Sequence, residues 1–357
     1  MWQRLKRLRK SFDSQALLIG FTPPAAILIM GFQDNIKATP AETKKVVSIY
    51  AARGPRMAME DRWFVSSDFK FFAVYDGHGG ARVAEHAQRS LYSEFMKELE
   101  GDGSNSKSED TSRASESGLD STKVKAALIK GFETVSDRIL SIPSLDVEGS
   151  TAVIVYLCGE LIVSANLGDS RAILCRGSKA IPLTVDHKPD SPGEKKRVEE
   201  LGGKVQWHGY LGPDRLPVPG MGAYRINGNL AVSRALGDRL ERPFVSSVPD
   251  INIINRKKEE DRFIVIASDG LWDVMTSQDV VDFVKQIMVT NASPATSRPK
   301  GKAVLPNSFS SSSLSLKKSD DFRKEMDKRM ENMAQFLVEE ALRRGSADNV
   351  TTIVVWL

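Results

Sequence analysis

The stretch FFAVYDGHGG, residues 71–80, is the segment that decides how the rest of this sequence is interpreted. Five apolar residues predict a buried β-strand, and the strand runs directly into Asp76, Gly77 and His78. An Asp at the end of such a strand is either a turn former or an oxygen ligand for a cation, with the glycine letting the backbone approach the ion. For a single Asp-Gly pair the turn is the commoner explanation, so recurrence of the pattern decides between the two.

The pattern does recur. Acidic residues stand beside other apolar runs at Glu60, Asp61, Asp169, Asp269, Asp273 and Asp348. Converging carboxylates repel one another, and only cations keep that many of them ionised together at neutral pH. The recurrence therefore favours a metal site, and a ligand set of oxygens alone indicates Mg²⁺ or Mn²⁺ rather than zinc.

Carboxylate clusters of this kind usually act on phosphate through a two-metal arrangement, in which a metal-bound hydroxide attacks the phosphorus in line. This chemistry needs a phosphate clamp and a proton donor for the leaving oxygen. Arg56, four residues before Glu60, offers a bidentate guanidinium, and His78 titrates in the useful range. The alternatives are a surface arginine and a histidine that structures its own glycine turn.

The remaining pattern predicts short β-branched strands broken by glycine-bearing turns, with a few amphipathic helices. Adjacent strands joined by tight turns favour antiparallel sheets with flanking helices over a βαβ fold. The helix at 321–344 carries a methionine-rich stripe that predicts core packing. The predicted strands are 46–52, 70–75, 150–157, 160–167, 171–175, 263–268 and 350–356, and the predicted helices are 81–99, 123–140, 194–201, 278–288 and 321–344.

These motifs together give the chain from about residue 46 to residue 357 a clear resemblance to the metal-dependent phosphatases of the protein phosphatase 2C family. Each motif is weak alone, but their shared order over the whole domain is specific. The motifs are RMAMED at 56–61, YDGHGG at 75–80, EGSTA at 148–152, GDSR at 168–171, LTVDH at 183–187, LAVSRALGD at 230–238, SDGLWD at 268–273 and DN at 348–349.

The resemblance implies an α+β fold: a sandwich of two antiparallel β-sheets flanked by α-helices, with a binuclear metal site at one edge. It also implies two Mg²⁺ or Mn²⁺ ions and a weaker third. By resemblance, Asp76 bridges two ions, Gly77 contributes its carbonyl, Asp269 and Asp348 bind one ion, Glu60 supports the other, and Asp169, Asp269 and Asp273 hold the third. In the same way Arg56 matches the phosphate-binding arginine, His78 the general acid and Asp61 an acidic residue that supports the site.

The implied activity is hydrolysis of phosphoserine and phosphothreonine on proteins without a covalent enzyme intermediate, by a chain expected to be a monomer. Two other functions compete with it. A catalytically silent scaffold would lack a metal-bridging carboxylate, Arg56 or His78, and none is missing. A hydrolase of nucleotides is disfavoured by the absence of a G-x-x-x-x-G-K-[ST] loop, although small phosphate esters stay open.

The N-terminal segment 1–44 is a separate unit from the catalytic domain predicted at 45–357. Its first ten residues carry five basic side chains, and no charge occurs between Asp13 and Asp34. Residues 14–33 are therefore a candidate for membrane association, although Pro23 and Pro24 would interrupt a spanning helix. A short anchor, a kinked hairpin, an organelle presequence and a secretory signal peptide all fit. The expected location is an intracellular membrane, with a mitochondrion, another organelle or the cytoplasm as alternatives.

Charge and composition exclude other classes. Lys and Arg number 50 and Asp and Glu 46, and the basic N-terminus accounts for the whole excess, so the rest of the chain sums to −1. Such a body lacks the basic face that nucleic acid requires. Cys158 and Cys175 predict buried thiols rather than a disulfide framework. Ser-rich stretches near 101–121 and 291–319 predict loops, and the long 205–224 segment is either a substrate-contacting flap or a surface loop.

Overall fold

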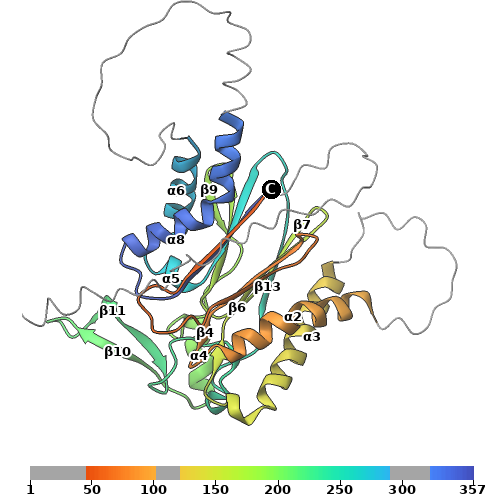
Figure 1. Cartoon of the computed structure of the whole chain (residues 1–357). Helices are drawn as coiled ribbons and strands as arrows, with labels where there is room; N and C mark the ends of the chain where they lie inside the picture. The colour runs from red at the N-terminus through yellow and green to blue at the C-terminus, as the bar shows by residue number, and fades with distance from the viewer. Residues whose placement is uncertain (1–45, 102–120, 290–321) are drawn as a thin grey trace, which may run out of the picture.

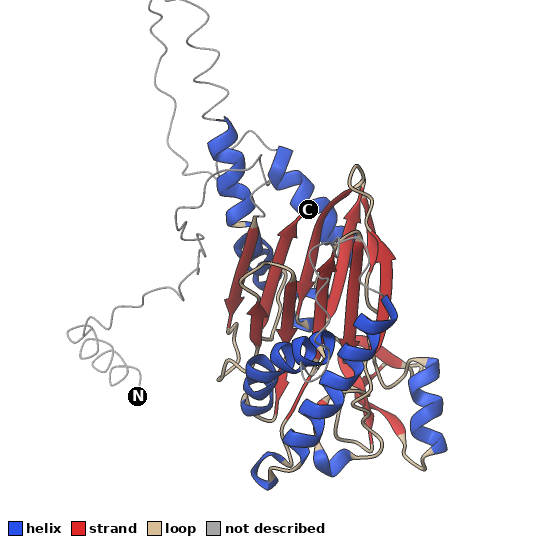
Figure 2. Ribbon diagram, turned by 90° about the vertical axis from the view of Figure 1, so that its right-hand side faces the viewer, coloured by secondary structure: helices blue, strands red, loops and turns tan. Residues whose placement is uncertain are grey.

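A computed structural model of the chain describes residues 46–101, 121–289 and 322–357. Two five-stranded antiparallel sheets lie at its centre (Figures 1 and 2). The first sheet has the order β1 (Val47–Ala52), β15 (Val350–Trp356), β14 (Asp261–Ala267), β8 (Arg171–Arg176) and β9 (Lys179–Pro182). The second has the order β13 (Asp250–Asn255), β7 (Leu161–Leu167), β6 (Ala152–Cys158), β3 (Phe71–Tyr75) and β2 (Arg62–Val65).

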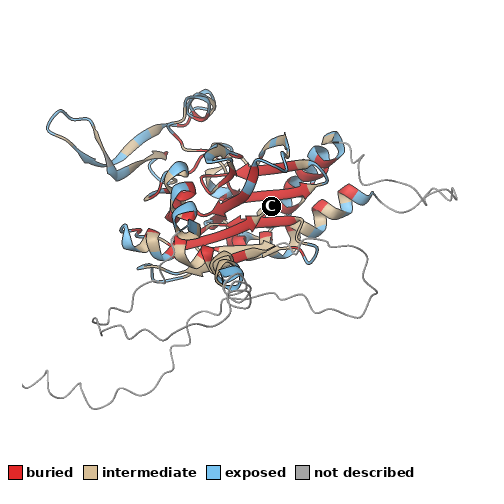
Figure 3. Ribbon diagram, turned by 90° about the horizontal axis from the view of Figure 1, so that it is seen from above, coloured by how far each residue is buried: buried red, intermediate tan, exposed pale blue. Residues whose placement is uncertain are grey.

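The sequence of β3 is apolar at every position, because both faces of this strand are buried. Phe72 and Val74 pack in the core between the two sheets, while Phe71 and Tyr75 pack in the core between the second sheet and its helices. All five residues of β3 are fully buried. Because both faces of the strand are covered, every position must be apolar. Figure 3 shows this concentration of buried residues in the two sheets.

Helices cover the outer face of each sheet (Figure 2). The second sheet is covered by α2 (Arg82–Glu100) and α3 (Ser121–Leu140), and the first by α6 (Ser277–Val289), α8 (Met333–Arg343) and the single turn α5 (Asp269–Trp272). The predicted sandwich of antiparallel sheets with outer helices is confirmed. Smaller elements lie near the lower end of the sandwich in Figure 1: β4 (Gly77–His78), β5 (Gly149–Ser150), β12 (Leu236–Gly237), α4 (Pro192–Glu200), η2 (Pro143–Leu145), η3 (Arg239–Glu241) and the hairpin β10 (Val205–Leu211) and β11 (Pro217–Ile226).

One predicted helix differs from the structure. The helical pattern at 321–344 is interrupted at Asn332, which separates helical residues 322–331 from α8. Asn332 leaves the helical ψ range, at 5°, and its side-chain amide donates to the Lys328 carbonyl. Met333 is buried, as the predicted stripe requires. Phe322 begins the same stripe but is more than half exposed, so the prediction of core packing is wrong at that residue.

The N-terminal segment 1–44 lies outside the described residues, as do nearly all of the two Ser-rich stretches. The prediction of membrane association therefore stays a prediction. Within the described residues, no helix has the length and apolar character needed to cross a membrane. Cys158 and Cys175 are both free thiols. Cys175 is buried as predicted, but the prediction is wrong for Cys158, which is only partly buried because it ends β6 beside the turn to β7.

Candidate active site

Acidic side chains from both sheets meet at one end of the sandwich. Asp76 directly follows β3, Asp169 lies two residues after β7, Asp269 follows β14 by two residues at the start of α5, and Asp348 lies two residues before β15. They lie close enough that Asp169, Asp269 and Asp348 each act on Asp76 through their charge. The structure therefore brings together the carboxylates that the sequence analysis selected.

Burial and mutual repulsion make this cluster costly to ionise. Burial raises the pKa of Asp76 well above its usual range, and the neighbouring charges of Asp61 and Asp269 raise it further. Burial likewise raises the pKa of Asp269, with Asp169 and Asp273 adding to the effect. Asp61 is raised to a pKa of about 6 by burial, against hydrogen bonds that lower it. Such carboxylates are stabilised by bound cations.

The residues present fit a hard divalent cation. Asp61 Oδ1 and Asp269 Oδ1 are buried oxygens without a hydrogen-bond partner, which is costly unless something else satisfies them. The cluster contains carboxylates and backbone carbonyls but no thiol, a donor set that suits Mg²⁺ or Mn²⁺. Within the described ranges, no three His, Cys, Asp or Glu side chains stand in the geometry of a finished metal site.

Hydrogen bonds from neighbouring strands fix the backbone around Asp76. The Thr151 N–H donates to the Asp76 carbonyl over 2.9 Å, and the Asp76 N–H donates to Thr151 Oγ1 over 3.2 Å. Gly77 lies against the loop that carries Glu60, since a Cβ at Gly77 would come within 2.7 Å of the Glu60 carbonyl oxygen. A glycine is therefore required for this close approach.

Asn349 fixes the loop that carries Glu60 and Arg56. Its side-chain amide donates to the carbonyls of Arg53 and Ala58 over 2.8 and 2.9 Å, and its Oδ1 accepts the Glu60 N–H over 2.7 Å. These three bonds join the loop before β2 to the start of β15, so one side chain holds two parts of the site together.

Arg56 lies at the opening of the site. Its Nη2 pairs with Asp348 Oδ2 and its Nε donates to the Ala347 carbonyl, while more than half of its side chain stays exposed. A groove of about 850 Å³ extends from Arg56 to the β10–β11 hairpin, which projects from the body of the molecule (Figures 1 and 3). Its walls include Lys188, Asp190, Trp207, Pro217, Tyr224, Ala231, Asp273 and Asp348.

His78 is held by a buried carboxylate. Its Nε2 lies 2.8 Å from Asp238 Oδ2, and Asp238 is almost completely buried. Burial alone would lower the pKa of His78, but the hydrogen bond and the charge of Asp238 outweigh it, so the pKa is raised. Because Asp238 accepts from Nε2, Nδ1 carries the proton that His78 can transfer.

Lys188 pairs with Asp169. Its ammonium Nζ contacts Asp169 Oδ2, and Asp169 is almost completely buried. The guanidinium of Arg171 pairs with Asp186 over 2.7 Å. The GDSR and LTVDH motifs, with the lysine that follows the second, are thus joined by charge-assisted bonds.

Comparison with known proteins identifies the family. Residues 48–307 match the family model described as Protein phosphatase 2C. The chain belongs to the protein phosphatase 2C family. It is 36% identical over 296 residues to protein phosphatase 2C 53 of Oryza sativa subsp. japonica, covering 80% of this chain and 58% of that protein. It is 33% identical over 314 residues to protein phosphatase 2C 3 of Arabidopsis thaliana, covering 84% of this chain and 66% of that protein.

Solved structures of similar proteins share the fold of this protein phosphatase 2C family member. A C. elegans sex determining protein superimposes with a TM-score of 0.63 at 25% identity, covering 89% of this chain and 66% of the other. A serine-threonine phosphatase 2C from Toxoplasma gondii gives a TM-score of 0.58 at 21% identity, covering 90% and 98%. The chain spans a little under two thirds of the length of the two plant relatives.

The sequence did not predict three residues that help to build this site. Asp238 ends the LAVSRALGD motif, and Asn349 follows Asp348, so each lay in a motif without an assigned role. Lys188 directly follows the LTVDH motif and carried no signal of its own. Their roles depend on contacts between distant segments, which spacing along one chain does not reveal.

Proposed function

We propose that this chain hydrolyses phosphoserine and phosphothreonine in proteins and requires Mg²⁺ or Mn²⁺. The observation that carries the proposal is the cluster of buried, mutually repelling carboxylates beside the exposed guanidinium of Arg56. Membership of the protein phosphatase 2C family supports it. The groove beside Arg56 also reaches Asp273 and Asp348 of the acidic cluster.

Two divalent ions would be held by the strand-end carboxylates together with the Gly77 carbonyl. When bound, such ions supply Lewis-acid stabilisation of the phosphoryl charge and activate water as a nucleophile. A weaker third ion would be held by a second, overlapping set of carboxylates. The residues proposed for the two main ions are Glu60, Asp76, Gly77, Asp269 and Asp348, and those for the third are Asp169, Asp269 and Asp273.

The protein side chains have separate tasks in this reaction. Arg56 exchanges its bond to Asp348 for two bonds to phosphate oxygens and orients the phosphoryl group. His78 gives its Nδ1 proton to the seryl or threonyl oxygen as the P–O bond breaks, so the alcohol leaves neutral. Asp238 positions the imidazole, and Asp61, which accepts from Ser268 Oγ over 2.8 Å, supports the acidic cluster.

The test is phosphate release from a phosphothreonine peptide by the full chain, with Mn²⁺ and then with EDTA. Release with Mn²⁺, its loss with EDTA, and a decrease of at least 100-fold in Asp269→Asn are expected, since removal of one electrostatic stabiliser costs roughly 10²–10³ in rate. Asp137→Asn, an exposed change on α3, is the matched control. No release from a folded chain at any Mn²⁺ or Mg²⁺ concentration would refute the proposal, and faster turnover of ATP would favour small phosphate substrates.

A further inference from the structure

Lys188 places a positive charge of the protein inside the acidic cluster. Besides its contact with Asp169, its charge opposes the burial that raises the pKa of Asp273, and it also acts on Asp269. The three carboxylates within reach of this one ammonium are those proposed for the third ion. About a third of the lysine side chain is exposed, on the groove that Asp273 also lines.

The backbone holds Lys188 opposite Asp169. Gly168 directly precedes Asp169, and His187 directly precedes Lys188. The His187 N–H donates to the Gly168 carbonyl over 2.9 Å, and the Gly168 N–H donates to His187 Nδ1 over 3.1 Å. These bonds fix the backbone next to both Asp169 and Lys188. A surface lysine would have no such support.

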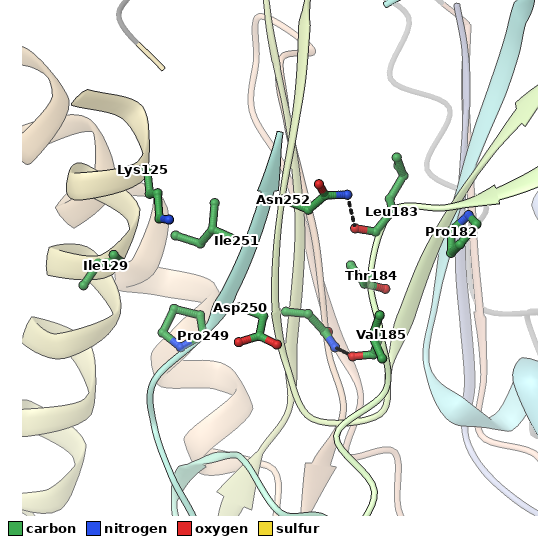
Figure 4. Close-up of a pocket in the computed structure, with 11 residues that line it drawn as sticks. Lys125, Ile129, Pro182, Leu183, Thr184, Val185, Pro249, Asp250, Ile251 and Asn252 are labelled. Carbon is green, nitrogen blue, oxygen red and sulfur yellow. Dashed lines mark hydrogen bonds between the residues drawn. The ribbon is translucent and has the colours of Figure 1, made fainter. Parts of the chain in front are cut away.

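The segment that leads to Lys188 is fixed as well. The Leu183 carbonyl accepts from Asn252 Nδ2 over 3.2 Å and from Ser164 Oγ over 2.6 Å, and the Val185 carbonyl accepts from Asn166 Nδ2 over 2.8 Å. Figure 4 shows the Leu183 carbonyl bonded to Asn252 of β13, and residues 182–185 and β13 both line a cavity of about 410 Å³. The segment is thus anchored on the sheet before it reaches the acidic cluster.

We propose that Lys188 is a built-in cation that occupies the outermost cation position of the site, beside Asp169, and competes there with a third divalent ion. The inference rests on the proposed function, because it assumes that the site binds divalent ions. Because the Lys188 ammonium already pairs with Asp169 Oδ2, a third divalent ion that binds this oxygen must displace Lys188. Lys188 is a positioning residue in this view: it keeps the outer carboxylates compensated and makes the third ion weak.

The test is Mn²⁺ binding to the full chain, followed by electron paramagnetic resonance of free Mn²⁺ and by titration calorimetry. In Lys188→Gln the dissociation constant of the weakest site is expected to fall at least ten-fold, because the competitor is gone, while the tighter sites change less than two-fold. In EDTA the same variant is expected to melt at a lower temperature, since the outer carboxylates have lost their cation. Neither readout depends on turnover.

Three further variants make the result specific. Lys188→Arg keeps the charge and should bind Mn²⁺ like the unmodified chain, and Lys188→Met is a second neutral variant in case Lys188→Gln folds poorly. Lys195→Gln, on an exposed face of α4, is the matched control and should leave Mn²⁺ binding unchanged. A weakest site that is unchanged or weaker in both neutral variants overturns the inference. An unmodified chain that binds no Mn²⁺ instead refutes the metal requirement of the proposed function.

Discussion

At the scale of single residues, the pair His78–Asp238 depends on an unusual backbone. Asp238 has φ 49° and ψ 48°, in the left-handed region that residues with a Cβ rarely adopt. Gly149 faces this pair, and a Cβ there would collide with both the Asp238 carboxylate and His78 Nε2. A strained Asp and an obligatory glycine thus place one buried carboxylate against one imidazole, which indicates a functional constraint.

His78→Gln tests the proton transfer through the leaving group. The substitution is expected to lower kcat for a phosphothreonine peptide by about 10²- to 10⁴-fold, because an alkoxide leaves poorly without a proton. Hydrolysis of p-nitrophenyl phosphate, whose phenolate leaves unaided, should fall less than ten-fold. Steady-state kinetics on both substrates give the two numbers. Equal losses on both would assign His78 to binding rather than to acid catalysis.

Residues chosen by motif and residues found by contact differ in a physical way. Asp76, Asp269 and Asp348 could be predicted because a carboxylate at the end of an apolar strand is conspicuous in sequence. Lys188 and Asn349 could not, because a lysine or an asparagine beside a motif is ordinary. Asn349 acts on residues 289 or more positions away, and only the folded chain brings them together.

At the scale of elements, the hairpin β10–β11 forms the wall of the groove farthest from the sheets. Gly209 and Gly222 face each other across it, and a Cβ at Gly209 would collide with the Gly222 Cα and the Met221 carbonyl. The rings of Trp207 and Tyr224 pack edge to face on the hairpin, with 5.3 Å between their centroids. The hairpin is thus shaped by one close backbone approach and one aromatic pair.

Gly209→Val is expected to separate these two strands and move the groove wall. We expect kcat/KM for a phosphothreonine peptide to fall about ten-fold, the equivalent of about 1.4 kcal/mol of lost contact. Turnover of p-nitrophenyl phosphate should change less than two-fold, since that substrate needs only the acidic cluster. Gly193→Val, at an exposed position with open space around it and no positive φ, is the control. An unchanged peptide kcat/KM would assign the 205–224 segment to a surface loop.

Glu194 connects α4 to the segment after β11. It accepts bonds from Arg234 over 2.7 Å and Arg197 over 2.8 Å. Burial alone would raise its pKa, but these two arginines and Ser233 outweigh it and lower the pKa to about 2. A carboxyl whose pKa is lowered on folding stabilises the fold above its unfolded pKa, and the stabilisation is lost as pH falls through the folded value.

This shift predicts a pH dependence of stability. Between pH 5 and pH 2 the free energy of unfolding should fall by about 3 kcal/mol more in the unmodified chain than in Glu194→Gln. The reason is that the pKa of Glu194 falls from 4.5 in the unfolded chain to about 2 in the folded chain. Urea unfolding followed by circular dichroism at pH 5, 3.5 and 2 measures the difference. Glu259→Gln, on an exposed turn, is the control. Parallel pH profiles for the unmodified chain and Glu194→Gln would contradict the prediction.

Most of the strands that the sequence predicted are buried on both faces. Strand β15 lies at its predicted bounds because its residues are apolar or β-branched throughout. Strand β13, with sequence DINIIN, and the hairpin strands were missed. Strand β13 is an edge strand with polar positions, and β10 and β11 are largely exposed and contain several glycines. None of these strands has the composition of a buried strand.

At the scale of the whole molecule, stability depends on the apolar layer between the two sheets. Ile264→Ala removes a fully buried side chain from this layer and should lower the free energy of unfolding by about 2–5 kcal/mol. Val289→Ala, at a position 79% exposed, should change it by less than about 0.5 kcal/mol. Denaturant titration of both variants checks the prediction. Similar values for the two would mean that the sheets are not packed as described.

The pairing of β15 with both β1 and β14 has a consequence for synthesis on the ribosome. Val47 pairs with Val355, so β1 cannot close its sheet until β15, far along the chain, has emerged. Asp348, which belongs to the acidic cluster, immediately precedes that same strand. A nascent chain therefore completes its first sheet and its acidic cluster in one late step. Stalled chains that end before residue 348 should be protease-sensitive and unable to bind Mn²⁺ tightly.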